Sequence, residues 1–231
     1  MKKLGLVGGM GPVSTVPYYK GIVYGVQQRL GRDEFPPLTI ESVDVFTMLS
    51  LCAQQKYDAL TEYLLRALDS LAASGCDFAA LSANTPHVVF DDLARRAPLP
   101  LVSIVDAACS CAVQRGVRTL GLLGTRFTME GSFFREPFER AGIRVIVPDA
   151  AEREWVQAHI ANELEHGVVR EETREGFVRI ISRIQAERGI EAVALGCTEL
   201  PLLLSDETSP VPCLDTLRIH VDALVEEIIR P

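Results

Sequence analysis

Cysteine 197 has the setting best suited to proton-transfer chemistry in this chain of 231 residues. It stands in the segment Leu195-Gly-Cys-Thr-Glu-Leu-Pro201, directly after an apolar run that predicts a strand. The carboxyl end of a parallel strand is where open α/β sheets present groups to ligands. N–H groups at the start of a following helix would stabilise a thiolate and lower the pKa of the thiol. We therefore predict that Cys197 is a catalytic acid and base, rather than an inert buried thiol.

The neighbours of Cys197 favour the same interpretation. Gly196 and Thr198 predict a tight polar turn instead of a core segment, and the Thr198 hydroxyl is available to a ligand. Glu199 is interpreted either as the carboxylate at the start of the following helix, where negative charge is favourable, or as a residue of the cleft, and we favour the first. The remaining five cysteines lack such a turn, and they are Cys52, Cys76, Cys109, Cys111 and Cys213.

A second polar turn, Ser82-Ala-Asn-Thr-Pro-His87, follows another apolar run. Asn84 and Thr85 offer donors suited to a carboxylate, or they cap a helix that has Pro86 in its first turn. Both interpretations can hold, because a helix N-terminus is itself an anion site. His87 and His220 are expected on helix surfaces or as supporting residues, not as primary catalysts.

Two glycine-containing loops follow the first strand of each half of the chain. Gly8-Gly-Met-Gly-Pro12 lacks the spacing of a dinucleotide-binding loop, and we expect its backbone to approach a small ligand. Ser14 and Thr15 then cap the next helix or donate to that ligand, and both alternatives stay open. The corresponding loop of the second half offers the hydroxyls of Thr125 and Thr128.

These turns require an α/β scaffold, and the hydrophobic pattern predicts one. Eight short apolar runs read as strands, near 4–7, 38–43, 78–81, 101–104, 119–123, 144–147, 192–195 and 211–214. Helical periodicity lies between them, near 17–30, 57–74, 86–94, 104–115, 129–141, 152–165, 171–188 and 216–229. Nearly continuous apolar strands separated by helices predict parallel sheets covered on both faces.

The sequence also contains an internal repeat. Three segments of the first half, beginning at Leu4, Asp77 and Pro100, are echoed in the same order at Leu120, Glu191 and Pro210. We predict two similar α/β lobes related by pseudo-twofold symmetry, formed by residues 1–100 with about 213–231 and by residues 101–212. The active site is expected in the cleft between them. The repeat places Ala83 opposite Cys197.

The composition argues against several classes of partner. The net charge is −8, and no dense run of Lys and Arg exists, so no nucleic-acid or anionic-membrane partner is expected. The apolar run after Met1 breaks at Gly8, which argues against a signal peptide. No stretch approaches the ~20 apolar residues needed to span a bilayer. We expect a cytoplasmic protein.

The same composition argues against bound metals and cofactors. Six cysteines and four histidines are scattered without zinc spacing or a disulfide framework. Only four lysines exist, and none follows Lys56, which leaves few candidates for a pyridoxal Schiff base. We expect neither a metal ion nor a cofactor.

Over essentially the whole chain, this order of motifs resembles the aspartate/glutamate racemase family. The segments that carry the resemblance are Gly5-Leu-Val-Gly-Gly-Met10, Ser14-Thr-Val-Pro-Tyr-Tyr19, Ser42-Val-Asp44, Asn84-Thr-Pro-His87, Leu122-Leu-Gly-Thr-Arg-Phe-Thr-Met-Glu130, Gly196-Cys-Thr-Glu199 and Asp215-Thr-x-x-Ile-His220. The resemblance implies cofactor-independent racemisation of an acidic amino acid by two opposed side chains, usually thiols, in a homodimer. It also implies roles in substrate binding for Met10, Cys52, Ala83, Asn84, Thr85, Thr125 and Thr198.

Ala83 departs from the family pattern, because relatives have Cys or Thr at the first catalytic position. A methyl group cannot transfer a proton, so two-thiol racemisation is not available. Four alternatives stay open: a racemase in which Ser82, Thr85 or water substitutes, a one-thiol isomerase or decarboxylase similar to arylmalonate decarboxylases, a carboxylate-binding protein without activity, and an engineered Ala83. We take the racemase as the working hypothesis.

Overall fold

Eight strands alternate with helices in the computed structural model, which describes residues 1–31 and 33–231. They are β1 (Leu4–Gly8), β2 (Leu38–Ser42), β3 (Phe78–Leu81), β4 (Leu101–Val102), β5 (Thr119–Leu123), β6 (Arg144–Ile146), β7 (Ala192–Leu195) and β8 (Cys213–Asp215). They form two parallel sheets of four strands, in the orders β2-β1-β3-β4 and β6-β5-β7-β8. The eight predicted strands and the α/β class are thereby confirmed.

The chain divides into two compact units, each built on one sheet. The first unit contains residues 1–104 and 217–231, and the second contains residues 105–216. β4 pairs with β3, and β8 pairs with β7. These units differ at their boundaries from the lobes expected from the sequence, which placed residues 101–104 in the second lobe and residues 213–216 in the first.

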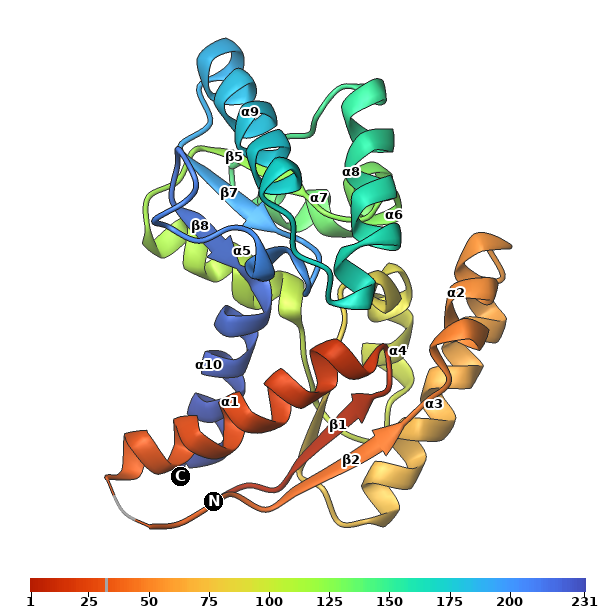
Figure 1. Cartoon of the computed structure of the whole chain (residues 1–231). Helices are drawn as coiled ribbons and strands as arrows, with labels where there is room; N and C mark the ends of the chain where they lie inside the picture. The colour runs from red at the N-terminus through yellow and green to blue at the C-terminus, as the bar shows by residue number, and fades with distance from the viewer. Residues whose placement is uncertain (32) are drawn as a thin grey trace. The chain divides into compact units, whose positions relative to one another are not determined.

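One face of the first sheet packs against α1 (Pro12–Leu30) and α10 (Thr216–Ile229), and Figure 1 shows both helices beside β1 and β2. Leu4 and Leu6 of β1 lie in one apolar cluster with side chains of both helices, namely Tyr18, Ile22, Val26, Val221, Leu224, Val225 and Ile228. A Cβ atom on Gly25 would lie 2.9 Å from Val225, so the two helices approach closely. Burial of this cluster is the main force that holds α10 to the first sheet.

The opposite face of the first sheet is covered by α3 (Tyr57–Ala73), which contacts α4 (Phe90–Arg96). Gly5 of β1 faces α3, and a Cβ atom there would lie 3.0 Å from Leu71. The short helix α2 (Val45–Ala53) lies beside α3 and buries Met48 and Cys52. The sheet is therefore enclosed on both faces, and the carboxyl ends of its strands form the edge at which open α/β sheets generally present groups to ligands.

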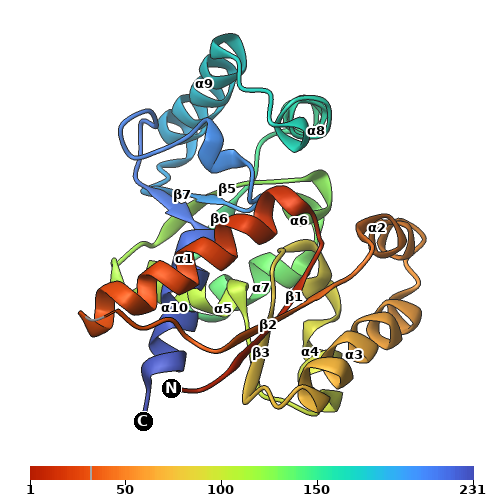
Figure 2. The same ribbon diagram turned by 60° about the horizontal axis from the view of Figure 1, so that its bottom comes forward.

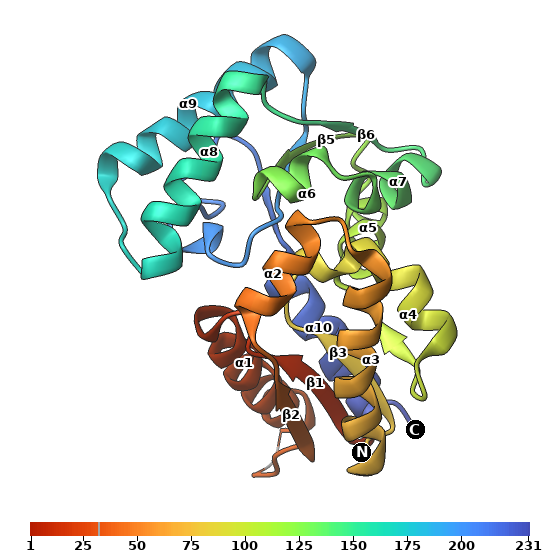
Figure 3. The ribbon, with the colours of Figure 1, turned by 90° about the vertical axis from the view of Figure 1, so that its right-hand side faces the viewer.

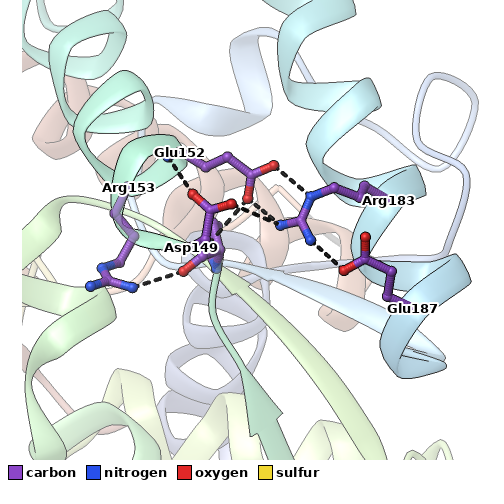
Figure 4. Close-up of polar contacts among 6 residues, drawn as sticks. Asp149, Glu152, Arg153, Arg183 and Glu187 are labelled. Atoms are coloured by element: carbon purple, nitrogen blue, oxygen red, sulfur yellow. Dashed lines mark hydrogen bonds and ion pairs between the residues drawn. The ribbon is translucent and has the colours of Figure 1, made fainter.

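The second sheet also lies between two layers of helices. Figures 2 and 3 show α8 (Ala150–Asn162) and α9 (Glu171–Arg188) on one face, with α5 (Ile104–Gln114) and α7 (Ser132–Arg140) on the other. α5 reaches α7 through the Cys109 thiol, which lies 3.5 Å from the Pro137 carbonyl oxygen. α8 and α9 are joined by an ion pair, because Arg183 of α9 binds Glu152 of α8 (Figure 4), and by the packing of Trp155 on Phe177 with ring centroids 5.2 Å apart.

Four helical segments differ from the sequence-based expectation. α1 begins at Pro12 instead of Pro17, and α2 was not predicted. The helix expected over 86–94 is a 3₁₀ turn, η1 (Thr85–Val89), followed by α4, and the helix expected over 129–141 is divided at Gly131 into α6 (Arg126–Glu130) and α7. The early start of α1 places Ser14 and Thr15 inside its first turn.

Among the described residues, no helix has both the length and the apolar character required to span a bilayer.

Candidate active site

The turns after β3 and β7 occupy equivalent positions in the two sheets. After β3, the Ser82 N–H donates to the Val7 carbonyl at 3.0 Å; after β7, the Gly196 N–H donates to the Leu123 carbonyl at 2.7 Å. In each case the acceptor is on the neighbouring strand, β1 or β5, which is the first strand of its sheet along the chain. Ala83 and Cys197 are each the next residue, so the structure supports their equivalence within the repeat.

The turn after β7 brings Cys197 into contact with Glu199. The Cys197 thiol donates to Oε2 of Glu199 at 2.9 Å, and the Thr198 hydroxyl donates to the same oxygen at 2.9 Å. Cys197 and Glu199 are both buried. Glu199 therefore accepts the hydrogen bond of the thiol. It also directly precedes a 3₁₀ turn over Leu200–Leu202, in agreement with its expected position at the start of a helical segment.

The electrostatics of Cys197 differ from the sequence-based expectation. Burial raises the pKa of the Cys197 thiol well above its ordinary value, and Glu199 and then Glu165 raise it further. Only a three-residue 3₁₀ turn, η3 (Leu200–Leu202), follows, so there is no long helix whose dipole would offset these effects. Cys197 consequently rests as a neutral thiol, and the predicted lowering of its pKa was wrong.

The loop after β5 packs against the turn that carries Cys197. The Thr125 side chain caps α6 by accepting from the Thr128 N–H at 3.3 Å, and the two hydroxyls lie 3.2 Å apart. A Cβ atom on Gly196 would lie 3.0 Å from the Leu123 carbonyl oxygen and 3.1 Å from Thr128. A side chain at position 196 would therefore displace the turn that carries the thiol.

The turn after β3 has a different chemical character. Ala83 and Asn84 are buried, and Thr85, which begins η1, is half-buried. Ser82 is fully buried, which disfavours it as a substitute base that must touch a ligand. His87 is also buried, and its Nδ1 atom lies 3.0 Å from the Ala83 carbonyl oxygen. His220 is buried as well, so the expected position on a helix surface was wrong for both histidines, and their alternative role as supporting residues stays a prediction.

The loop after β1 is organised by Thr15. Its hydroxyl accepts from the Gly9 N–H at 3.0 Å and donates to the Gly11 carbonyl at 2.9 Å, while the Ser14 hydroxyl donates to the same carbonyl at 3.0 Å. Gly9 has a φ of +79°, a conformation that L side chains rarely adopt. Met10, the residue after Gly9, is buried. Both hydroxyls thus bind the loop itself, which is a third role besides capping or ligand binding.

Cys52 lies in the last turn of α2. Its thiol points toward the Met48 sulfur at 3.8 Å, and burial raises its pKa to about 11. All six cysteines are free thiols. Cys52 is therefore a buried residue of the helix, and a role as a substrate contact remains a prediction.

The chain matches the family model of the Asp/Glu/hydantoin racemases over residues 7–224, nearly its whole length. It belongs to that family. In sequence it is 22% identical over 218 residues to the broad specificity amino-acid racemase RacX of Bacillus subtilis, with 92% of each chain covered. The relatives of this racemase-family chain therefore place it among the isomerases.

Solved structures agree with this assignment of the racemase-family chain. An Asp/Glu racemase candidate from Yersinia pestis is 37% identical, with a TM-score of 0.93 and full coverage of both chains. An aspartate racemase homologue from Pyrococcus horikoshii OT3 is 35% identical, with a TM-score of 0.89 and full coverage of both. Glutamate racemase from Francisella tularensis, at 15% identity and a TM-score of 0.68, shares the fold and covers 98% of this chain and 80% of its own.

Proposed function

We propose that this chain is a cofactor-independent racemase or epimerase of an amino acid of the aspartate or glutamate type, in which Cys197 moves the Cα proton. The observation that carries the proposal is the 2.9 Å contact between the Cys197 thiol and Glu199. A thiol with a carboxylate acceptor in a buried turn is a pair that can exchange one proton without solvent. Membership of the racemase family supports the reaction class.

In the proposed reaction, Glu199 first takes the thiol proton, which leaves a thiolate on Cys197. The thiolate then removes the Cα proton: the Cα–H bond breaks, an S–H bond forms, and the electron pair passes into the substrate carboxylate. Donors at Asn84, Thr85 and Thr198 would bind that carboxylate, while Met10, Cys52, Ala83 and Thr125 would line the site. Because the thiol itself carries the proton, no cofactor takes part.

Reprotonation determines the stereochemical outcome. Ala83 holds the position equivalent to Cys197, and its methyl group has no proton to give. Water or the Thr85 hydroxyl must therefore deliver the proton to the other face of Cα if the product is the opposite enantiomer. We expect slow inversion and a strong preference for removing the proton from one enantiomer.

A second candidate function, protonation of a carbanion on a single face, is favoured by the resting state of the thiol. Burial and Glu199 raise the pKa of Cys197, so that the group is a proton donor before any substrate binds. A decarboxylase needs only such a donor: loss of CO₂ from a malonate-type diacid leaves the electron pair on carbon, and the thiol protonates it. One thiol is sufficient for this reaction.

Proton NMR in D₂O with L- and D-aspartate and L- and D-glutamate tests the proposal. Cys197→Ala is the decisive variant, and Cys213→Ala is its matched control, because both cysteines are 8% exposed. Loss of the Cα–H signal with the natural chain and Cys213→Ala, but not with Cys197→Ala, is the expected result. Appearance of the opposite enantiomer then identifies a racemase.

Two other results have distinct meanings. Exchange of one enantiomer with retention of configuration would point to one-sided proton transfer by Cys197. No exchange with any of the four amino acids would contradict the proposal, and release of CO₂ from a malonate-type diacid would then identify the second candidate. Binding of these acids without exchange or CO₂ release would leave a carboxylate-binding protein.

A further inference from the structure

His87 joins the turn of Ala83 to the end of the first unit through one buried ring. Its Nδ1 atom lies 3.0 Å from the Ala83 carbonyl oxygen, and the Ile104 N–H donates to its Nε2 atom at 3.3 Å. Ile104 is the last residue of the first unit before the chain enters the second. The ring therefore contacts the main chain at two points, Ala83 and Ile104, and the second lies 17 residues beyond His87 itself.

These two partners determine the tautomer of His87. A backbone N–H can only donate, so Nε2 must be the unprotonated nitrogen that accepts from Ile104. A carbonyl oxygen can only accept, so Nδ1 must carry the hydrogen that it donates to Ala83. Burial, with the neighbouring His220, lowers the pKa of His87 to about 3, so this neutral form persists at neutral pH.

The ring is also held in its own plane. His87 stacks on Phe90 with ring centroids 4.9 Å apart and planes inclined by 7°. The peptide unit is planar, so a hydrogen bond to the Ala83 carbonyl fixes the orientation of the whole Ala83–Asn84 peptide. The position of the following donors, Asn84 and Thr85, depends on that orientation.

We propose that His87 is a positioning residue for the substrate-binding turn, acting through its Nδ1–H bond to the Ala83 carbonyl. The inference rests on the proposed function, in which Asn84 and Thr85 bind the substrate carboxylate. His87 itself does not touch the substrate. Its bond to Ile104 sets the ring tautomer, and its bond to Ala83 sets the turn.

Two amide variants separate the two bonds of the ring. In His87→Asn the side-chain N–H takes the place of Nδ1–H and retains the donor to Ala83, whereas in His87→Gln the side-chain oxygen takes the place of Nε2 and retains the acceptor for Ile104. We expect His87→Gln to raise the KM for the exchanged amino acid about tenfold, the effect of one lost hydrogen bond. His87→Asn should recover most of that loss.

Tyr18→Phe is the stability control. The Tyr18 hydroxyl donates to Nδ1 of His220 at 2.7 Å, so the variant removes a buried bond from the same unit without touching Ala83 or Ile104. Tyr18→Phe shows how KM changes when the unit only loses stability, measured as a lower Tm. If both His87 variants follow the same relation between KM and Tm, His87 is only a structural residue and the proposal is overturned.

Nitrogen-15 NMR of the unmodified chain tests the inference without variants and without turnover. The expected spectrum has a protonated Nδ1 and an unprotonated Nε2 for His87; the opposite tautomer would overturn the proposal. Amide shifts of residues 83–85 should change in His87→Gln and much less in His87→Asn. Because these readouts need no reaction, failure of all exchange assays would contradict the proposed function alone.

Discussion

The turns after β3 and β7 have the same place in their sheets but different chemical content. After β7, the Cys197 thiol donates to Glu199 inside a buried turn. After β3, Ala83 has no titratable atom, and the buried group behind it, His87, binds the main chain at the Ala83 carbonyl. The turn after β7 carries a proton donor and its acceptor, whereas in the turn after β3 the buried side chain fixes the conformation of the main chain.

The difference indicates that the equivalent turns of the two halves of the internal repeat have different roles. Under the proposed function, the second unit would supply the proton transfer, while the first would supply the donors to the substrate and the buried histidines that fix them. His220 belongs to the same group, because its Nε2–H donates to the Val102 carbonyl at 3.1 Å and its Nδ1 accepts from Tyr18. The predictions below test this division.

Mild acid should destabilise the first unit more than the second. Burial lowers the pKa of His87 to about 3 and that of His220 to about 4, so below pH 6.5 the unfolded chain takes up protons that the folded unit does not. The free energy of unfolding then falls as the pH falls, by about 2 kcal/mol per ring between pH 7 and pH 5. Urea titrations followed by amide signals of β1 and β5 measure it.

His220→Gln provides the control for the acid effect. The variant should lose about half of the pH dependence of the β1 signals, because one of the two rings is gone. Equal sensitivity of the β1 and β5 signals to pH would contradict the assignment of the effect to the first unit.

Ala83→Cys should restore proton transfer to the first unit. A second thiol at the equivalent position allows direct protonation of the other face of Cα, so we expect inversion to become about a hundredfold faster. Chiral chromatography of the product measures inversion, and NMR in D₂O measures exchange on the same sample. Ala83→Ser is matched in size, but its hydroxyl is a far weaker acid; an equal gain there would refute the explanation.

Glu199→Gln should lower the rate of Cα exchange about tenfold, because the amide cannot take the thiol proton. The pKa of Cys197 should fall at the same time, since Glu199 raises it through its charge and its hydrogen bond. Alkylation of the thiol as a function of pH measures that pKa. Glu165→Gln is the control: Glu165 raises the pKa by charge alone, so its removal should lower the pKa slightly and leave exchange unchanged.

The smallest predicted effect concerns the helices of the second unit. Besides the packing of Trp155 on Phe177, α8 and α9 are joined by Arg183 of α9, which binds Glu152 of α8 through Nε at 2.7 Å (Figure 4). Arg183 also binds Glu187 of its own helix at 2.5 Å. Arg183→Met should lower the free energy of unfolding by about 1 kcal/mol. Arg179→Met, whose exposed ion pair with Glu175 is 3.8 Å long, should have almost no effect. Urea unfolding followed by Trp155 fluorescence compares them.

The strands could be predicted because their signal is local. Each is a short apolar run, and the repeat of the first half in the second identified both sheets. α2 was missed because Val45–Ala53 is apolar on most sides and lacks a helical period. Its start did have a local sign: the Asp44 side chain accepts from the Phe46 and Thr47 N–H groups, as an N-cap does.

The sequence predicts which residues follow each strand in the site, but it does not predict which of their side chains bond to one another. The place of Cys197 and its equivalence to Ala83 follow from the repeat. The bond from Cys197 to Glu199 depends on side-chain conformation in a turn too short to have a periodic pattern, although a carboxylate two residues after a cysteine was a sign of it. The role of His87 depends on Ile104, a contact that no local pattern encodes.

The return of α10 to the first sheet has a consequence for the order of assembly. The second unit is one continuous segment, whereas the first needs residues from both sides of it. During synthesis, the second unit is complete before Leu224, Val225 and Ile228 exist to fill the first core. The unit that carries the Cys197 thiol can thus form early, and the unit that contains the Ala83 turn must wait until α10 has been synthesised.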